Sequence, residues 1–318
     1  NGSLSSKTAP ELGSTVIKKC IENSELKKEE VDMVYMGQVL SAGVGQNPAR
    51  QASIYAGLPN TTTNTTINQV CGSGLASVAL AFNSIRCGDG NIIIAGGQES
   101  MSNAPHYIKL RKGEKVNEDK IKDTMIIDGL WDVYNEYHMG TTAENVAEKF
   151  NIKRQDQDKF ALNSQEKAIK AIKEKKFINE IVPVEINNNI YFEQDEHPRE
   201  NTSIEKLSEL KTTFKKDGTV TPGNSSGIND GAAAVCLMTF ENVKKKKIKP
   251  LAKIVSWAQC GVDPSIMGTG PIPASKLALK KAGWDIKELE LIESNEAFAA
   301  QSIAVNKELG WETNNLNV

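Results

Sequence analysis

One cysteine lies in a sequence context suited to covalent chemistry. Cys71 follows the short apolar segment 67–70 and precedes Gly-Ser-Gly, after which residues 75–86 have helical apolar spacing. A strand-to-helix turn of this kind offers unpaired backbone N–H groups and the positive end of a helix dipole. Such surroundings favour the thiolate by lowering the pKa of a thiol, which makes it a nucleophile for a thioester carbonyl. Because cysteine is also among the residue types most often buried, the local pattern leaves a structural role for Cys71 open.

Two further segments carry small and polar side chains. Residues 294–301, SNEAFAAQ, follow the strand-like sequence LELIE, so Asn295 and Glu296 are expected at a strand end, where an amide can hold a water or a carbonyl oxygen. Residues 219–234, TVTPGNSSGINDGAAA, are rich in glycine and small side chains, which indicates backbone packed closely against another group. The GxxxxGK[ST] pattern is absent there, so a phosphate-loop interpretation is weak.

Alternating helical and strand patterns would position these residues. Helix is predicted over 10–23, strand over 31–37, and a buried strand ending in glycines over 91–97. The helix after Cys71 is predicted to have one apolar face, formed by Leu75, Val78, Ala79, Phe82 and Ile85. Residues 273–294 repeat the plan of the first helix and strand. We therefore expect two similar α/β halves, although a chance match stays open.

The middle of the chain differs in texture. From about 101 to 219 it becomes polar, which indicates an inserted loop domain. Thr141 with Glu144 predicts a capping box, and residues 155–175 have an apolar helical face. The run NNN at 187–189 predicts a turn.

Composition limits the class of protein. The 318 residues are 39% hydrophobic and carry a net charge of −2, which argues against a general nucleic-acid binder or a protein drawn to anionic membranes; a polyanionic small ligand would need a local basic patch. The five cysteines have no CxxC pairing, which favours a reduced compartment, and we expect a cytoplasmic protein. No apolar run approaches the ~20 residues of a membrane span, and the first residues lack signal-peptide features. Because the first residue is not Met, a lost targeting segment stays open.

Six motifs, in this order, resemble those of the thiolase family: NQVCGSGLASV, GGQESMSNAPH, YHMGTTAENVA, TVTPGNSSGINDGAAA, CGVDPSIMGTGPIPA and SNEAFAAQ. The similarity runs over essentially the whole chain. It implies an α/β protein with the five-layered α-β-α-β-α thiolase fold, built from two similar halves with an inserted loop domain. Residues 1–100 and 220–250 would form the N-terminal half, and 251–318 an incomplete C-terminal half. Residues 101–219 would form the loop domain, which covers coenzyme A and includes a tetramer hairpin at 107–125.

The resemblance also implies site roles. Cys71 resembles the nucleophile that accepts the acyl group, with its own backbone N–H in one oxyanion hole, and Asn295 resembles the residue that holds a catalytic water in the other. His138 and Met139 resemble the short-chain biosynthetic members, in which the methionine closes the acyl pocket. The other correspondences are Met267 and Phe298 with the apolar lining, Ser226 with a pantetheine contact, Leu130 and Arg199 with contacts to the nucleotide end of coenzyme A, and Lys206 in place of a frequent serine. Without the family match, the two methionines and Phe298 would more often be core residues, and His138 a packed or capping histidine.

The implied reaction is acyl transfer. Two acetyl-CoA would condense to acetoacetyl-CoA and coenzyme A, or the reverse, through acetyl-Cys71, with no metal or redox cofactor and with a homodimer or homotetramer as the assembly. The alternatives are a degradative 3-ketoacyl-CoA thiolase of broader chain length, a ketoacyl synthase, and a non-catalytic coenzyme A or lipid-binding relative. The family's GHP and Cys-x-Gly-Gly-Gly segments are not among these 318 residues. The resemblance therefore implies a chain truncated at both ends, without its first strand, and an activity that belongs to a longer parent.

Overall fold

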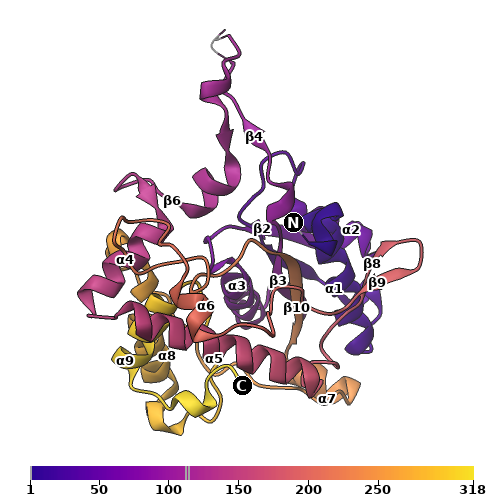
Figure 1. Ribbon diagram of the computed structural model, residues 1–318. Coiled ribbons are helices and arrows are strands. Elements are labelled where there is room, and N and C mark those ends of the chain that lie inside the picture. Colours follow the sequence, from indigo (N-terminus) through magenta and orange to yellow (C-terminus); the bar gives the residue numbers. More distant parts are fainter. Residues whose placement is uncertain (1, 112, 114) are drawn as a thin grey trace. The chain divides into compact units, whose positions relative to one another are not determined.

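The computed structural model describes residues 2–111, 113 and 115–318 (Figure 1). They fall into two compact units, each described by itself below. The first unit comprises the described parts of Asn1–Gly129, Val182–Glu193 and Ile228–Ile254, and the second comprises Leu130–Ile181, Gln194–Gly227 and Val255–Val318. The divisions after residues 129 and 227 fall later in the chain than the boundaries predicted for the loop domain.

A four-stranded sheet forms the centre of the first unit. Its order is β10-β3-β1-β2, where β1 is Met33–Gly37, β2 is Thr63–Ile67, β3 is Ile92–Ser100 and β10 is Asp230–Met238. Strands β1, β2 and β3 are parallel, and β10 is antiparallel to β3. The strands predicted over 31–37 and 91–97 are confirmed.

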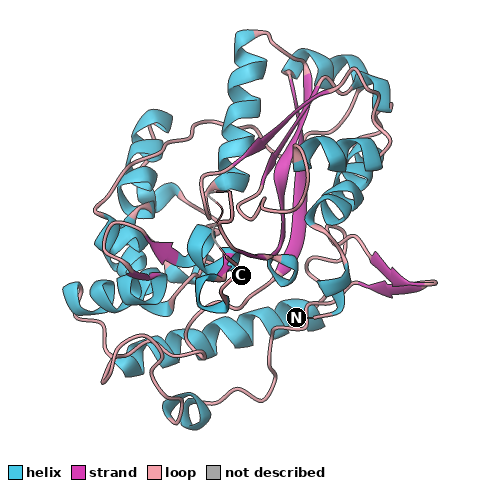
Figure 2. Cartoon of the chain, turned by 90° about the horizontal axis from the view of Figure 1, so that it is seen from above, coloured by secondary structure: helices cyan, strands magenta, loops and turns pink. Residues whose placement is uncertain are grey.

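Helices cover both faces of this sheet (Figure 2). Helices α1, Ala9–Asn23, and α2, Pro48–Tyr55, pack on one face, and α3, Ser73–Cys87, packs on the other. Strand β3 shows the reason, because its side chains alternate between the two faces. Ile94 belongs to the core under α1 and α2, whereas Ile93 belongs to the core under α3.

The apolar face predicted for α3 is partly wrong. Leu75 is 80% exposed, and the buried positions of the helix carry small residues: Ser73, Ala76, Ser77, Ala79 and Ala81. Small residues occur there because the helix approaches the strands closely. The window Val70–Cys87 is also long and apolar enough to span a membrane by composition, contrary to our expectation of no such run, although core helices share this property.

Short elements complete the first unit. Strand β4, His106–Tyr107, pairs with β5, Lys122–Asp123, while β8, Val184–Asn187, and β9, Ile190–Phe192, form a hairpin at the predicted NNN turn. Residues 112 and 114 of the predicted tetramer hairpin lie outside the described residues. The remaining helices are η1 Ser3–Ser6, η2 Lys28–Glu30, η3 Met101–Asn103, η4 Glu118–Lys120, the π-helix η5 Met125–Leu130, which ends at the first residue of the second unit, and α7 Phe240–Lys246.

The second unit is mainly helical. Its elements are β6 Trp131–Asp132, β7 Tyr137–His138, α4 Met139–Lys149, α5 Arg154–Lys173, α6 Ile204–Ser208, η6 Pro264–Thr269, α8 Pro271–Ala282, η7 Ile286–Glu288, α9 Ala299–Leu309 and η8 Thr313–Asn315. Helices α4 and α9 share an apolar core that includes Val146, Ala300 and Ala304. The helix predicted over 155–175 is confirmed.

Two local predictions for the second unit are wrong. Thr141 does not cap a helix, because α4 already begins at Met139 with His138 as its N-cap, and Glu144 instead accepts hydrogen bonds from the backbone of Thr219. The segment LELIE forms no strand in the described chain. Within this segment only Ile292 makes a bridge, with Leu316, through backbone hydrogen bonds to Asn315 and Asn317.

Candidate active site

Cys71 lies on the turn between β2 and α3, as predicted. It is exposed, and α3 begins two residues later at Ser73. The preceding residue, Val70, has a φ of 48°, a left-handed conformation that is costly for a β-branched residue. The turn therefore needs specific contacts to keep its shape.

Two polar side chains supply those contacts. The Ser73 hydroxyl donates to the Val70 carbonyl oxygen at 2.6 Å and accepts from the Gln69 N–H at 2.8 Å. The Asn68 side-chain oxygen accepts from the Val70 N–H at 2.9 Å. These bonds hold both peptide groups of the strained residue, so the turn presents Cys71 in one conformation. The CGSG motif was the signal in the sequence, but the role of its serine was missed.

Close packing sets α3 against the ends of the parallel strands. A Cβ on Gly37, the last residue of β1, would lie 2.5 Å from the Ser73 carbonyl carbon. The Ser77 hydroxyl donates to the Gly96 carbonyl oxygen on β3 at 2.7 Å. The helix N-terminus, with its unpaired N–H groups, therefore lies at the carboxyl edge of the sheet, where α/β proteins place their sites.

The expected lowering of the pKa of Cys71 is wrong. Protein atoms surround the sulfur of this otherwise exposed residue closely enough that desolvation raises its pKa, and this is the largest cause. A hydrogen bond from its own backbone N–H acts in the opposite direction. Desolvation therefore disfavours the thiolate, and acyl transfer needs a proton acceptor. The same backbone N–H lies beside the sulfur. It can therefore donate to the oxyanion that develops on the carbonyl oxygen when the sulfur attacks a thioester.

In the second unit, Asn295 is carried by the loop 294–298 before α9. The Asn317 side chain holds the start of this loop, with its oxygen accepting from the Ser294 N–H at 2.8 Å and its amide donating to the Ser294 carbonyl at 2.9 Å. The same amide donates to Glu296 at 2.7 Å, and the Ser164 hydroxyl donates to the other oxygen of Glu296 at 2.5 Å. Asn295 itself is exposed and makes no hydrogen bond to the described residues, so its amide is available to a ligand.

The segment 221–226 lies along the other side of this loop. The Ser226 N–H donates to the Ala297 carbonyl oxygen at 3.0 Å, and Ser225 forms a bridge with Phe298. Ser226 and Asn295 therefore lie on neighbouring segments of the second unit, a contact that the two separate motifs of the sequence did not predict.

His138 and Phe298 meet through a residue that sequence reasoning missed. The His138 ring stacks on Phe214 at 4.7 Å between centroids, and Phe214 meets Phe298 edge-on at 6.4 Å. His138 Nδ1 accepts the Gly140 N–H at 3.0 Å, and burial lowers the pKa of His138, so both effects favour a ring whose Nδ1 is an acceptor. The histidine is both a packed and a capping residue. The single aromatic residue in the polar segment KTTFKKD was the available signal for Phe214.

The remaining candidates take separate positions in the second unit. Met139 starts α4, Met267 lies in η6, and both are half-buried. Leu130 ends the π-helix, and Arg199 is exposed, with its N–H donating to Gln165 at 2.7 Å. The Lys206 ammonium donates to the Asn201 carbonyl. Among the residues that the structure describes, no hydrogen bond or ring contact joins this set into one cluster, so their predicted roles stay predictions.

A polyanionic ligand requires a basic patch, and the segment 211–217 is a candidate for it. A surface hollow of about 450 Å³ is lined by Lys211–Asp217, which includes Phe214 and three lysines. Of these lysines, Lys215 pairs with Glu148 at 3.3 Å. In the part of the chain that the structure describes, no three His, Cys, Asp or Glu side chains gather as metal ligands would.

The comparisons with known proteins agree with these features. The family profile of the thiolase N-terminal domain matches residues 1–241, and that of the thiolase C-terminal domain matches residues 248–318. The acetyl-CoA acetyltransferase of Allochromatium vinosum is 52% identical over 323 residues, and that of Cupriavidus necator is 53% identical over 322; each alignment covers 100% of this chain and 82% of the relative. The crystal structure of the Bacillus anthracis acetyl-CoA acetyltransferase matches with a TM-score of 0.95 at 39% identity, covering 99% of this chain and 81% of that one. Profiles, relatives and fold agree over the whole sequence, and the chain belongs to the thiolase family.

Proposed function

We propose that this chain is an acetyl-CoA C-acetyltransferase that uses Cys71 as its acyl acceptor. The observation that carries the proposal is the turn at Cys71, where a nucleophile of the right type is exposed beside its own backbone N–H at a helix N-terminus. The relatives that match the whole chain at 52–53% identity bear the name of this activity.

The first half-reaction is the transfer of an acetyl group to Cys71. The cysteine sulfur attacks the thioester carbonyl carbon, the bond between that carbon and the sulfur of coenzyme A breaks, and coenzyme A leaves with the proton. The Cys71 N–H stabilises the oxyanion of the tetrahedral intermediate. Because the pKa of Cys71 is raised, this step depends on a base, which the family supplies from its GHP motif.

In the second half-reaction, a second acetyl-CoA gives a methyl proton to a base, which the family supplies from the cysteine of its Cys-x-Gly-Gly-Gly segment, and the carbanion attacks acetyl-Cys71. A carbon–carbon bond forms, the thioester to Cys71 breaks, and acetoacetyl-CoA is released. Asn295 would hold the water that stabilises the developing enolate, since its exposed amide lies on a loop fixed by Asn317 and Ser226.

Substrate contacts follow from the second unit. Phe298, Phe214 and His138 offer an apolar wall suited to the pantetheine chain and a short acyl group, with Met139 limiting acyl length. The lysines of Lys211–Asp217 offer positive charge to the phosphates of coenzyme A. The family resemblance further supports contacts of Leu130 and Arg199 with the nucleotide end of coenzyme A, and of Met267 with the acyl group and pantetheine. We also propose that the protein is a homo-oligomer, which size-exclusion chromatography with light scattering would test. A cytoplasmic location is a separate proposal.

The test is cleavage of acetoacetyl-CoA by coenzyme A, followed as the loss of enolate absorbance. The protein that carries the family's GHP and Cys-x-Gly-Gly-Gly segments in addition to these 318 residues is compared with its Cys71→Ala variant and with Cys87→Ala, which removes an exposed thiol at the end of α3. We expect turnover that is lost in Cys71→Ala, by at least about 10³-fold, and kept in Cys87→Ala. Turnover that survives in Cys71→Ala, or that is absent from all three chains, contradicts the proposal for this chain.

A further inference from the structure

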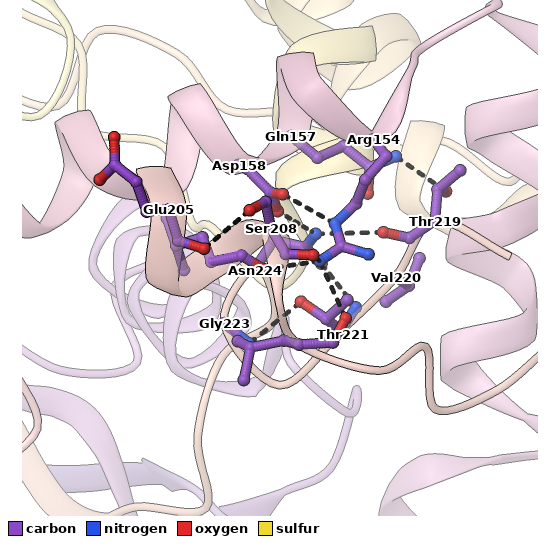
Figure 3. Close-up of polar contacts among 12 residues, drawn as sticks. Arg154, Gln157, Asp158, Glu205, Ser208, Thr219, Val220, Thr221, Gly223 and Asn224 are labelled. Carbon is purple, nitrogen blue, oxygen red and sulfur yellow. Dashed lines mark hydrogen bonds and ion pairs between the residues drawn. The ribbon is translucent and has the colours of Figure 1, made fainter. Parts of the chain in front are cut away.

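A buried polar network in the second unit supports the segment beside Asn295 (Figure 3). Its centre is Asp158 on α5, which is 2% exposed. One oxygen of its carboxylate accepts from Arg154 Nε at 2.8 Å, and the other accepts from Asn224 Nδ2 at 3.0 Å. Arg154 lies one turn earlier on α5, whereas Asn224 lies in the segment 221–226 that carries Ser226.

Arg154 connects this carboxylate to α6. Its Nη2 donates to the carbonyl oxygens of Leu207 at 2.6 Å and of Leu210 at 3.0 Å, which are the end of α6 and the chain that follows it. A planar guanidinium makes these bonds in fixed directions, so α6 and the carboxylate are held in one geometry.

Asn224 connects the Asp158 carboxylate to the segment 221–226, which carries Ser226. Its side-chain oxygen accepts from the Thr221 N–H at 2.8 Å, and its amide also donates to the Thr219 carbonyl oxygen at 3.1 Å. Its own carbonyl oxygen accepts from the Ala299 N–H at 2.9 Å, at the start of α9. Asn224 therefore fixes both the turn that carries Ser226 and the residue that follows Phe298.

Energetics favour a role in geometry over a role in stability. A buried ion pair costs desolvation that its attraction barely repays, so an apolar replacement of similar volume is often as stable. A fully hydrogen-bonded network in a region of low dielectric does fix a unique arrangement. The side chains of Arg154 and Asp158 are 23% and 3% exposed. The pair is therefore a buried network of this kind, which fixes one arrangement of its segments.

We infer that Asp158 is a positioning residue for coenzyme A binding. Through Asn224 it sets the distance between the loop of Ser226 and the loop of Asn295 and Phe298, against which the pantetheine chain is held. The inference rests on the proposed function, because it assigns these loops to the substrate. Asp158 touches no substrate itself.

The experiment measures the affinity of coenzyme A by isothermal titration for the wild-type chain, Asp158→Asn and Glu166→Gln. The last variant removes the same charge from an exposed position of α5 and is the matched control. In Asp158→Asn, an amide N–H faces one of the two donors. We expect Kd to rise roughly tenfold, which corresponds to about 1.4 kcal/mol, and no change in Glu166→Gln.

Two further readouts separate positioning from damage to the fold. The rate of Cys71 alkylation by iodoacetamide, a reagent that needs no coenzyme A site, stays within about twofold of the wild-type rate. In the double variant Asp158→Asn, Asn224→Asp, the amide and the carboxylate are exchanged, and part of the lost affinity returns. If Asp158→Asn does not fold, Arg154→Lys takes its place with the same expectation, because lysine keeps the charge but not the fork to Leu207 and Leu210.

The outcomes are distinct. Failure of the wild-type chain to bind coenzyme A contradicts the proposed function. Binding by the wild-type chain with an unchanged Kd in the folded variants overturns the positioning role while leaving the function in place. An affinity loss without any return in the double variant also overturns it, since the coupling between positions 158 and 224 would be absent.

Discussion

At the scale of single residues, the Cys71 turn shows how much of a site is visible in a sequence. The pattern CGSG after an apolar segment predicted both the nucleophile and its turn. It did not predict the direction of the pKa shift, because the helix N-terminus is a local feature whereas desolvation depends on atoms brought in by the fold. The same limit applies to His138, whose partner Phe214 is 76 positions away.

A pH profile tests the state of the thiol. Since the pKa of Cys71 is raised, its reaction with iodoacetamide should be slower at pH 7 than that of an unperturbed cysteine, and its rate should still be rising past about pH 8.5, where the rate of an unperturbed thiol begins to level off. The measurement is the alkylation rate at Cys71 from peptide mass spectrometry between pH 6.5 and 10. A rate that already levels off below pH 8 would show a lowered pKa and contradict this interpretation.

At the scale of elements, periodicity predicted where helices and strands lie better than what they bury. Helix α3 was expected to bury Leu75, but close contact with β1 admits only small residues at its start. Local capping patterns failed for a related reason, since Glu144 bonds to the distant Thr219 instead of to its own helix. Long-range contacts decided both cases, and neither residue carries a signal of them in its immediate sequence.

A pair of glycines tests the close approach of α3 to the sheet. Gly37→Ala puts a Cβ 2.5 Å from the Ser73 carbonyl carbon, so we expect a loss of about 1–3 kcal/mol in the free energy of unfolding. Gly74→Ala is the control. It has nothing within 4 Å of the added Cβ and lies inside the helix, so it should be neutral or gain up to about 1 kcal/mol. Urea denaturation compares the two, and equal losses would argue against the close contact.

The contact between α1 and β10 makes the first unit sensitive to alkali. Burial raises the pKa of Cys20 on α1 to about 12 and that of Cys236 on β10 to about 11. In the unfolded chain both thiols ionise near pH 8.5. The folded state therefore holds more protons between pH 8.5 and 12, so the contribution of these thiols to stability is complete below pH 8.5 and is lost as pH rises through that range.

The corresponding measurement is the melting temperature at pH 8 and pH 10. It should fall more in the wild-type chain than in the double variant Cys20→Ala, Cys236→Ala. The comparison uses the difference between the two pH values, because the substitutions also remove packing at both values. An equal fall in both chains would mean that these thiols do not couple to folding.

At the scale of the whole molecule, the order of motifs predicted the family where single elements could not. The first unit has α1, then η2 and β1, and the second has α8, then η7 and the bridge at Ile292, so the helix, short turn and extended segment do recur. The strand expected at LELIE did not form a ladder. A strand needs a partner as well as a pattern, and the sequence of one segment does not state what lies beside it.

The most direct test of the central claim is the mass of the protein, with the family's GHP and Cys-x-Gly-Gly-Gly segments in place, after incubation with acetyl-CoA. If Cys71 accepts the acetyl group, the intact mass should rise by the mass of one acetyl group, peptide mapping should place the group on Cys71, and added coenzyme A should remove it. Cys71→Ala should stay unmodified, and Cys87→Ala should behave as the wild-type chain does. An acetyl group found on another residue, or none at all, would contradict the assignment of Cys71 as the acyl acceptor of this chain.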